Sequence, residues 1–334
     1  MNILMTAASR RVPLVQALQS ALRAHGGGRV VVTDVDPSSP AVHIADRAYR
    51  VPISSEPGYV DALLAICKAE RIGLVVPTID DELEILAGSS KRFEGAGAVL
   101  ACSPASTAAL CNDKYSTCRH LRAHGIDAAH SWLPQEIPSD AAELLFIKPR
   151  TGRGSVGAYQ VRNRRELEFF LDYVTNPVVQ EFLQGPEYTI DMMCDWSGTP
   201  LSIVPRERLL IRAGVSDRGR TVKSPQLEAL AVRIAAVIPF HGPVNIQCRM
   251  RGDAAVVFEI NPRFSGGIPL TIAAGADFPA MLVQIAQGHT PAQALGSFRA
   301  DLWMTSYETA LFLPPARLRL SPPQTAAAHL SGAA

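Results

Sequence analysis

Short apolar runs alternate with segments of helical periodicity over the first hundred residues. Strands are expected over the apolar runs Asn2–Thr6, Arg29–Thr33, Ile72–Pro77 and Ala98–Cys102. Helices are expected where apolar residues recur at helical spacing, over Val12–Ala24, Tyr59–Glu70 and Asp81–Ser90. A strand–helix alternation of this kind predicts a parallel sheet with helices on its faces, which is an α/β domain.

Ligands of parallel α/β sheets lie beyond the carboxyl ends of the strands. The first strand is followed there by Ser9, Arg10 and Arg11. The two arginines either bind a carboxylate or phosphate or are solvated residues at the start of a helix. The loop 6–11 lacks the G-x-G-x-x-G spacing, so a dinucleotide site has little support.

A second alternating pattern lies near residue 250 and predicts a β-hairpin. Val244–Met250 is strand-like, as is the stretch Val256–Arg263 up to its stop at Pro262, and the turn between them centres near Asp253. Gln247 and Glu259 are each six residues from that centre and should therefore lie opposite each other. Period two places Glu259 with Val257 on one face, and Phe258 with the core residues on the other.

The hairpin carries the strongest candidate chemistry in the chain. Gln247, Glu259 and Asn261 would form one cluster of oxygen ligands, which suits Mg²⁺. Arg263 follows directly and supplies a permanent positive charge. The alternative is an ordinary polar sheet face.

Two lysines stand where phosphate groups could be held. Asn112 is expected to cap a helix running to His124, with Lys114 in its first turn, an unusual place for a cation. Lys148 ends a strand and leads into a loop containing Gly152, Gly154, Ser155 and Gly157, whose backbone N–H groups could approach phosphate oxygens. An exposed lysine and a flexible hairpin are the simpler alternatives.

A strand ending near Glu181 runs through Phe182 and Leu183 into a Gly-Pro turn, and a further strand opens with Glu187. A short connector of this kind can offer backbone groups to the edge of an adenine. A carboxylate a few residues later can accept hydrogen bonds from ribose hydroxyls.

Composition narrows the class of protein. The chain has 334 residues, 47% of them hydrophobic and 19% charged, with a net charge of +1. These values indicate a globular protein of several domains and give no support for a nucleic-acid or membrane partner. The six cysteines are scattered, which favours reduced thiols. With no signal-peptide pattern or long apolar run, we expect a cytoplasmic protein.

Taken in order, these motifs resemble the ATP-grasp superfamily of ligases over residues 100–290. The segment Gly242–Leu295 is most similar to one half of a carbamoyl-phosphate synthase large subunit, and Glu181–Glu187 resembles D-alanine–D-alanine ligase. The resemblance implies an α/β domain at 1–104, a small ATP-grasp lobe at 105–184, a large lobe at 185–313 and a loose tail at 314–334.

The resemblance also implies roles for the candidate residues. Lys114 and Lys148 would hold ATP phosphates under a lid formed by 152–157, and Glu181, Phe182 and Leu183 would contact adenine. Glu187 would bind ribose, and Arg263 would stabilise the transferring phosphoryl group. The metal set would hold one or two Mg²⁺ ions, which Mn²⁺ could replace.

The expected activity is an ATP-dependent carboxylate–amine ligase that acts through an acyl phosphate on two small molecules, and a homodimer is compatible with it. A kinase-like or carbamoyl-phosphate-forming enzyme and a non-catalytic nucleotide-binding protein are the alternatives. The segment 206–223 is too basic for ATP alone, so Arg206, Arg212 and Lys223 are candidates for an acidic substrate. Arg249 shares a strand face with Gln247 and is a stronger candidate.

Overall fold

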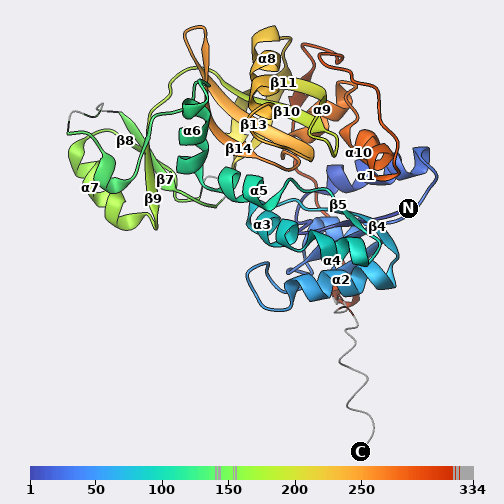
Figure 1. Ribbon diagram of the computed structural model, residues 1–334. Helices are drawn as coiled ribbons and strands as arrows, with labels where there is room; N and C mark the ends of the chain where they lie inside the picture. Colours follow the sequence, from blue (N-terminus) through green and yellow to red (C-terminus); the bar gives the residue numbers. More distant parts are fainter. Residues whose placement is uncertain are drawn as a thin grey trace, which may run out of the picture. The chain divides into compact units, whose positions relative to one another are not determined.

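The computed structural model describes residues 1–139, 141, 144–152, 154, 156–318, 320 and 323. The chain divides into two compact units, which are described separately (Figure 1). The first contains residues 1–105, 277–291 and 307–334, and the second contains 106–276 and 292–306. No helix in the described part of the chain is long and apolar enough to cross a membrane.

The first unit is built on a five-stranded parallel sheet, as the alternating pattern predicts. The strand order is β3-β2-β1-β4-β5. The strands are β1 (Asn2–Met5), β2 (Val30–Asp34), β3 (Arg47–Arg50), β4 (Ile72–Val76) and β5 (Val99–Leu100). All five residues of β2 are buried, as expected for a strand covered on both faces. The sequence pattern missed β3, because this edge strand is polar and partly exposed.

Helices complete the first unit. They are α1 (Val12–Ala24), α2 (Tyr59–Ala69), α3 (Asp80–Gly88), α4 (Ser90–Gly95) and α10 (Phe278–Ala286), with the 3₁₀ segments η1 (Pro40–His43) and η3 (Pro315–Leu318). Helix α10 comes from far along the chain, and Gln287, just after it, donates a hydrogen bond of 2.8 Å to the carbonyl oxygen of His25. Most of the expected tail at 314–334 lies outside the described residues.

The second unit contains two antiparallel sheets. The smaller has the order β6-β9-β7-β8 and the larger the order β14-β13-β10-β11-β12-β15. The smaller sheet consists of β6 (Ser131–Trp132), β7 (Leu145–Pro149), β8 (Tyr159–Val161) and β9 (Pro177–Glu181). The larger consists of β10 (Glu187–Cys194), β11 (Pro200–Arg212), β12 (Val215–Thr221), β13 (Gly242–Arg251), β14 (Ala254–Asn261) and β15 (Trp303–Thr305).

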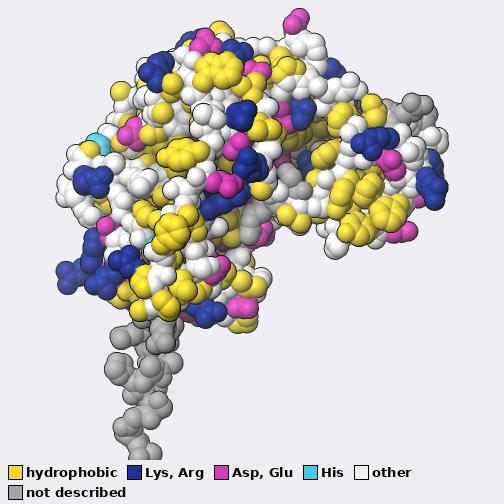
Figure 2. All heavy atoms as spheres, turned by 180° about the vertical axis from the view of Figure 1, so that it is seen from behind, with side chains coloured by type: hydrophobic (Ala, Val, Ile, Leu, Met, Phe, Trp, Pro, Cys, Tyr) yellow, Lys and Arg dark blue, Asp and Glu magenta, His cyan; other side chains and the backbone are white. Residues whose placement is uncertain are grey.

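The smaller sheet carries helix α7 (Arg164–Tyr173), with the short 3₁₀ segment η2 (Pro134–Glu136) beside it. Asn163 caps α7 by accepting a hydrogen bond from the backbone N–H of Glu166. Phe169 and Tyr173 stack on each other, and their side chains are 60% and 62% exposed, respectively. Figure 2 shows hydrophobic side chains gathered on this lobe, at the right of the view.

The two faces of the larger sheet differ in polarity. One face packs its apolar residues, including Ile190, Ile203 and Ile246, into a core with helices α6 (Lys114–Ala123) and α8 (Pro225–Ala235). The alternate residues of the same strands, such as Asp191, Arg206 and Gln247, point to the other face and are polar. Helices α5 (Ala105–Asn112) and α9 (Ile268–Ala273) complete the elements.

The helix that carries Lys114 starts differently from the prediction. Asn112 is the last residue of α5, and Asp113 is the N-cap of α6. Asp113 has extended backbone angles, and its carboxylate accepts hydrogen bonds from the N–H groups of Tyr115 and Ser116. The prediction of Asn112 as the cap is therefore wrong by one residue, because the short helix α5 occupies the preceding segment.

Candidate active site

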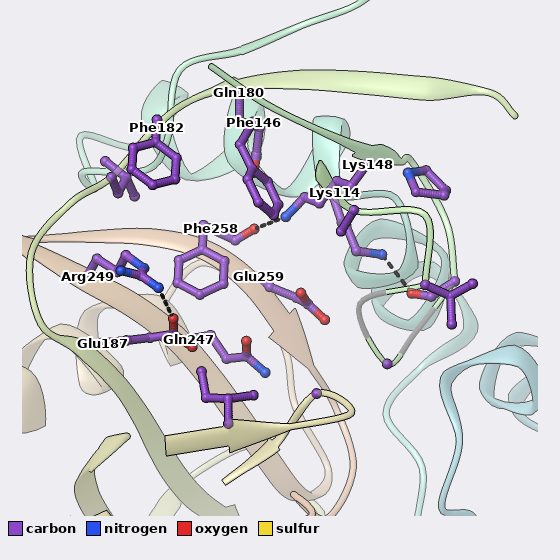
Figure 3. Close-up of a pocket in the computed structure, with 18 of the residues that line it drawn as sticks. Lys114, Phe146, Lys148, Gln180, Phe182, Glu187, Gln247, Arg249, Phe258 and Glu259 are labelled. Atoms are coloured by element: carbon purple, nitrogen blue, oxygen red, sulfur yellow. Dashed lines mark hydrogen bonds and ion pairs between the residues drawn. The ribbon is translucent and has the colours of Figure 1, made fainter. Parts of the chain in front are cut away.

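A cavity of about 290 Å³ lies between the smaller sheet, its glycine-containing loop and the polar face of the larger sheet (Figure 3). Lys114, Lys148 and Glu259 lie toward one end of it, and Phe182 and Arg249 toward the other. One end of the pocket therefore carries two lysines and a carboxylate, and the other carries an aromatic ring and an arginine.

The predicted hairpin forms one wall, and the predicted pairing of Gln247 with Glu259 is confirmed. β13 and β14 pair antiparallel with Gln247 opposite Glu259 and Asn245 opposite Asn261. Both Gln247 and Glu259 line the cavity. Asn261 is almost fully buried directly behind Glu259, to which its amide nitrogen donates a hydrogen bond of 3.1 Å.

A β-bulge changes which side chains of β14 reach the pocket. The register shifts between Gln247 and Cys248, so that Cys248 pairs with Val257 and Phe258 becomes the extra residue. Val257 is buried in the core, whereas Phe258 lines the cavity. The predicted faces of Val257 and Phe258 are therefore wrong, because strict period-two alternation does not hold across a bulge.

The charged end of the cavity is organised by mutual attraction between buried groups. Burial lowers the pKa of Lys148 below its ordinary value, and nearby Glu259 opposes that effect. Burial likewise works against the ionised carboxylate of Glu259, but Lys148, Lys114 and Arg263 outweigh it and lower its pKa. Glu259 is therefore an anion at neutral pH.

The two lysines reach the same end of the cavity from different elements. Lys148, on β7, points its ammonium at the carbonyl oxygen of Phe258 at 3.5 Å and over the Phe258 ring. Lys114, at the start of α6, donates to the carbonyl oxygen of Gly152 at 2.7 Å. The lysine in the first helical turn therefore points away from its own helix, toward the glycine loop.

The donor set fits a magnesium ion that arrives with a polyphosphate. Among the described residues, no group of three or more His, Cys, Asp or Glu could hold a metal ion alone. The charged end of the pocket offers the carboxylate of Glu259, and the amide of Gln247 pairs opposite it on the hairpin, with Asn261 behind Glu259. Mg²⁺ is commonly bound by one or two carboxylates while substrate phosphates and water complete its coordination.

Arg263 lies beside this donor set. One of its nitrogens donates to the side-chain oxygen of Asn261 at 3.1 Å and another to the carbonyl oxygen of Phe264 at 3.0 Å. Its side chain also lines the cavity. Arg263 is thus fixed next to the charged end, where a fixed cation can stabilise developing negative charge.

Glu187 is held between two arginines on the floor of the cavity. Its two carboxylate oxygens bind Arg208 at 2.6 Å and Arg249, respectively. Arg249 also donates to the carbonyl oxygen of Gly185 at 3.1 Å. The three residues come from β10, β11 and β13, which are neighbours in the sheet.

The connector after β9 forms the other end of the pocket. Phe182 lies 6.5 Å from Phe146, centroid to centroid, and both line the cavity with Leu183. Glu181 pairs with Arg251 at 2.9 Å and accepts a hydrogen bond from the backbone N–H of His130 at 3.0 Å. An aromatic wall of this kind is suited to a flat heterocycle.

Several predicted substrate residues do not line this cavity. Arg206 is buried against Asp191, Lys223 donates to the carbonyl oxygen of Gly296, and Arg212 is 61% exposed near Asp217. None of the three lines the cavity, and their contact with an acidic substrate stays a prediction. Arg10 is an exposed residue of the first unit, and its role stays a prediction.

The glycine loop is only partly described. Gly152 and Gly154 line the cavity, whereas Gly157 lies against the ring of Pro149. Ser155 lies outside the described residues. Ten further pocket residues were not among the predicted site residues: Phe146, Pro149, Thr151, Val156, Ala158, Gln180, Arg208, Ile211, Gly214 and Phe258. In the sequence, Arg208 was noticeable only as one of several positive charges in the basic segment 206–223.

A parallel α/β unit together with a unit of two antiparallel sheets is the combination of the ATP-grasp fold class. Comparison with known proteins agrees. Residues 174–310 match the family described as "ATP-grasp in the biosynthetic pathway with Ter operon", and residues 3–101 match "PylC-like, N-terminal domain". The chain therefore carries an ATP-grasp domain together with a PylC-like N-terminal domain.

Curated relatives include carbamoyl phosphate synthase large chains. The arginine-specific chain of Bacillus subtilis is 25% identical over 247 residues, which are 68% of this chain and 23% of that protein. The chain from Thermus thermophilus is 26% identical over 271 residues, covering 74% and 26%, respectively. This chain spans about a quarter of the length of these relatives.

Solved structures share the fold at low sequence identity. The biotin carboxylase domain of Hydrogenobacter thermophilus 2-oxoglutarate carboxylase aligns with a TM-score of 0.70 and 15% identity, covering 90% of this chain and 73% of that one. The Staphylococcus aureus N5-carboxyaminoimidazole synthetase gives 0.69 and 14%, covering 87% and 78%. The Bacillus licheniformis L-amino acid ligase gives 0.67 and 17%, covering 90% and 77%.

Proposed function

We propose that the cavity binds Mg–ATP and that the protein is an ATP-dependent carboxylate–amine ligase. The observation that carries the proposal is the pairing of Gln247 with Glu259 at the charged end, with Lys148 beside them. That arrangement supplies one anion for a divalent cation and fixed cations for phosphate oxygens. The resemblance to L-amino acid ligase and to other ATP-grasp structures supports the same assignment.

The pocket residues divide between binding and catalysis. Phe146, Phe182 and Leu183 hold the base, and Lys148 and Lys114 neutralise the phosphates. Glu259, Gln247 and Asn261 would hold Mg²⁺, which neutralises phosphate charge when bound. Arg263 stabilises charge on the transferring phosphoryl group, which moves to the substrate carboxylate as ADP leaves. The amine then attacks the acyl phosphate, and phosphate departs.

Glu187 needs a revised role. Both of its oxygens are bound by arginines, so it orients Arg208 and Arg249 in addition to any hydrogen bond with a ribose hydroxyl. Each carboxylate oxygen has a second acceptor direction, so one contact with ribose remains compatible with these ion pairs.

The test is release of ADP from Mg–ATP when amino acids are supplied singly and in pairs. We expect ADP only when a suitable carboxylate and a suitable amine are both present, together with a coupled product. ADP formed with bicarbonate alone would instead favour a carbamoyl-phosphate-forming enzyme. Binding of ATP with no ADP under any pairing would favour a non-catalytic nucleotide-binding protein.

The substrates we propose are small molecules, and the reaction is placed in the cytoplasm. All six cysteines are buried thiols, which supports a reducing compartment. A homodimer is the proposed assembly, and light scattering of the purified chain tests it directly.

A further inference from the structure

Arg208 is an arginine of the pocket wall that binds protein groups in several directions. Its side chain is 5% exposed. Besides Glu187, the guanidinium donates to the side-chain oxygen of Gln247 at 3.1 Å, the carbonyl oxygen of Gly214 at 2.9 Å and the hydroxyl of Ser216 at 3.2 Å. These partners lie on β10, β13, the β11–β12 turn and β12.

Arginine is suited to this position because its donors diverge in a fixed plane. A lysine ammonium carries the same charge, but it is a point donor on a flexible stem and cannot reproduce that fork. Burying the cation is costly, and Glu187 compensates for the cost as its ion-pair partner. The Arg208 side chain thus links side chains and a turn carbonyl whose orientations the backbone hydrogen bonds of the sheet do not fix.

Gln247 is the most consequential of these partners. Its amide can rotate, and its oxygen must face the charged end of the cavity to act as a metal ligand. Arg208 donates to that oxygen at 3.1 Å, whereas the amide nitrogen makes only a longer contact of 3.4 Å with Asn245. The oxygen has a second acceptor direction that a cation can use. Arg208 therefore selects which end of the amide is presented.

Gly214 connects the same arginine to the glycine loop. Gly214 has a φ of +75°, and a Cβ placed there would come within 2.9 Å of the Cα of Gly154. The turn between β11 and β12 therefore lies against the loop that lines the phosphate end of the cavity. By binding the Gly214 carbonyl, Arg208 fixes the turn and the metal wall relative to each other.

We propose that Arg208 is a positioning residue that orients Gln247 for the metal and holds the β11–β12 turn against the glycine loop. The proposal rests on the proposed function, because it assumes that Mg²⁺ binds at Gln247 and Glu259. It predicts that loss of the guanidinium fork raises the Mg²⁺ requirement of nucleotide binding more than it weakens binding without Mg²⁺.

The experiment is calorimetric titration with a non-hydrolysable ATP analogue at a series of Mg²⁺ concentrations. In Arg208→Lys, which retains the charge, the Mg²⁺ concentration for half-maximal enhancement should rise about tenfold or more, as for other groups that orient metal ligands. Arg220→Lys is the matched control, because Arg220 lies on the neighbouring strand and pairs with Glu207. It should leave the Mg²⁺ dependence unchanged.

Gln247→Met provides the second background, since methionine has a similar shape and no amide. If Arg208 acts through Gln247, Arg208→Lys should shift the Mg²⁺ dependence by less than about threefold in that background, a non-additivity expected of residues in contact. Equal shifts in both backgrounds would overturn the proposal. So would an equal loss of affinity with and without Mg²⁺ in Arg208→Lys, which indicates general damage to the pocket.

The parent protein separates this proposal from the proposed function. If the parent binds the analogue without any Mg²⁺ enhancement, the metal site itself is wrong, and the positioning role falls with it. If the parent shows the enhancement and Arg208→Lys retains the parent's Mg²⁺ dependence, only the role of Arg208 is wrong. A urea-unfolding midpoint for each variant confirms that folded proteins are compared.

Discussion

Two buried ion pairs on strand β11 differ in what covers them. Arg206 binds Asp191 at 2.7 Å, and Ser265 and Thr271 complete the contacts, so both partners are only 1% exposed. Arg208, two residues later, binds Glu187 at 2.6 Å at the edge of the cavity. The first pair is enclosed by the fold, whereas the second can respond to a ligand.

The difference shows why a basic sequence segment does not identify a substrate site. Arg206 and Arg208 have the same parity on one strand, so they point to the same face of the sheet. Gly267 lies so close to Arg206 that a Cβ there would come within 2.4 Å of the guanidinium, which places the pair beneath a covering segment. Covering segments of this kind come from distant parts of the chain.

The largest effect should come from breaking the enclosed pair. Asp191→Ala leaves the Arg206 charge buried without its carboxylate, and we expect a loss of about 3–5 kcal/mol in unfolding free energy. Glu187→Ala should cost less, because Arg249 is 32% exposed and can be solvated, and the buried Arg208 keeps its hydrogen bonds to Gln247, Gly214 and Ser216. Urea unfolding of both variants measures the difference. Equal losses would mean that the two pairs are energetically the same kind of contact.

Arg263 extends the comparison of buried arginines to the catalytic step. Arg263→Ala should retain much of the ATP affinity but lose about 10²-fold in turnover, about 2.7 kcal/mol, because its charge matters most during transfer. Turnover is followed by ADP release once a substrate pair is found, with matched nucleotide titrations. Turnover equal to that of the parent would make Arg263 a structural residue.

A variant of Lys148 tests the role of the buried cation that interacts with Glu259. Lys148→Ala should weaken ATP binding by at least tenfold, about 1.4 kcal/mol, since a buried charge facing the phosphates is removed. Lys223→Ala is a suitable control, because Lys223 lies outside the cavity and donates to Gly296. ATP affinity that is the same in both folded variants would remove Lys148 from the phosphate site.

The smallest effect concerns a partly exposed pair. Asp113 caps α6 and binds Arg150, and although burial opposes ionisation, these hydrogen bonds lower its pKa below the ordinary 3.8. Asp113→Ala should cost about 1 kcal/mol at neutral pH. Because the folded-state pKa is the lower one, this contribution is complete above the unfolded pKa and is lost as pH falls through the folded value.

Unfolding free energies of parent and Asp113→Ala between pH 7 and pH 2 measure that dependence. The two curves should converge at the acid end. A difference that stays constant to low pH would show that the ionised carboxylate does not provide the stabilisation.

Local patterns predicted much of the framework. The parallel sheet of the first unit is confirmed, because it follows from periodicity along continuous segments. The pairing of Gln247 with Glu259 is also confirmed, but the turn centres between Gly252 and Asp253, and the bulge supplies the extra residue that brings the two side chains opposite each other. The bulge at Phe258 was missed, since the inserted residue leaves no mark in composition. The cap at Asp113 was missed because Asn112 is an equally good capping residue by type.

The pocket itself could be predicted only in part. Lys114, Lys148 and the hairpin residues belong to motifs that follow one another along the sequence, and those motifs predicted them as site residues. Phe146, Arg208 and Ile211 line the cavity because separate strands come together there, and their own neighbours along the chain carry no such information. Polarity alone could not separate Arg208 from Arg206 either, because only the covering residues distinguish them.

The central claim is that Glu259 supplies the charge by which this pocket binds a nucleotide with Mg²⁺. The most direct measurement is titration of the parent and Glu259→Gln with ATP, each in the presence and in the absence of Mg²⁺. We predict that Mg²⁺ strengthens ATP binding to the parent and has little effect on Glu259→Gln. Equal enhancement by Mg²⁺ in both proteins, or none in the parent, would contradict the account.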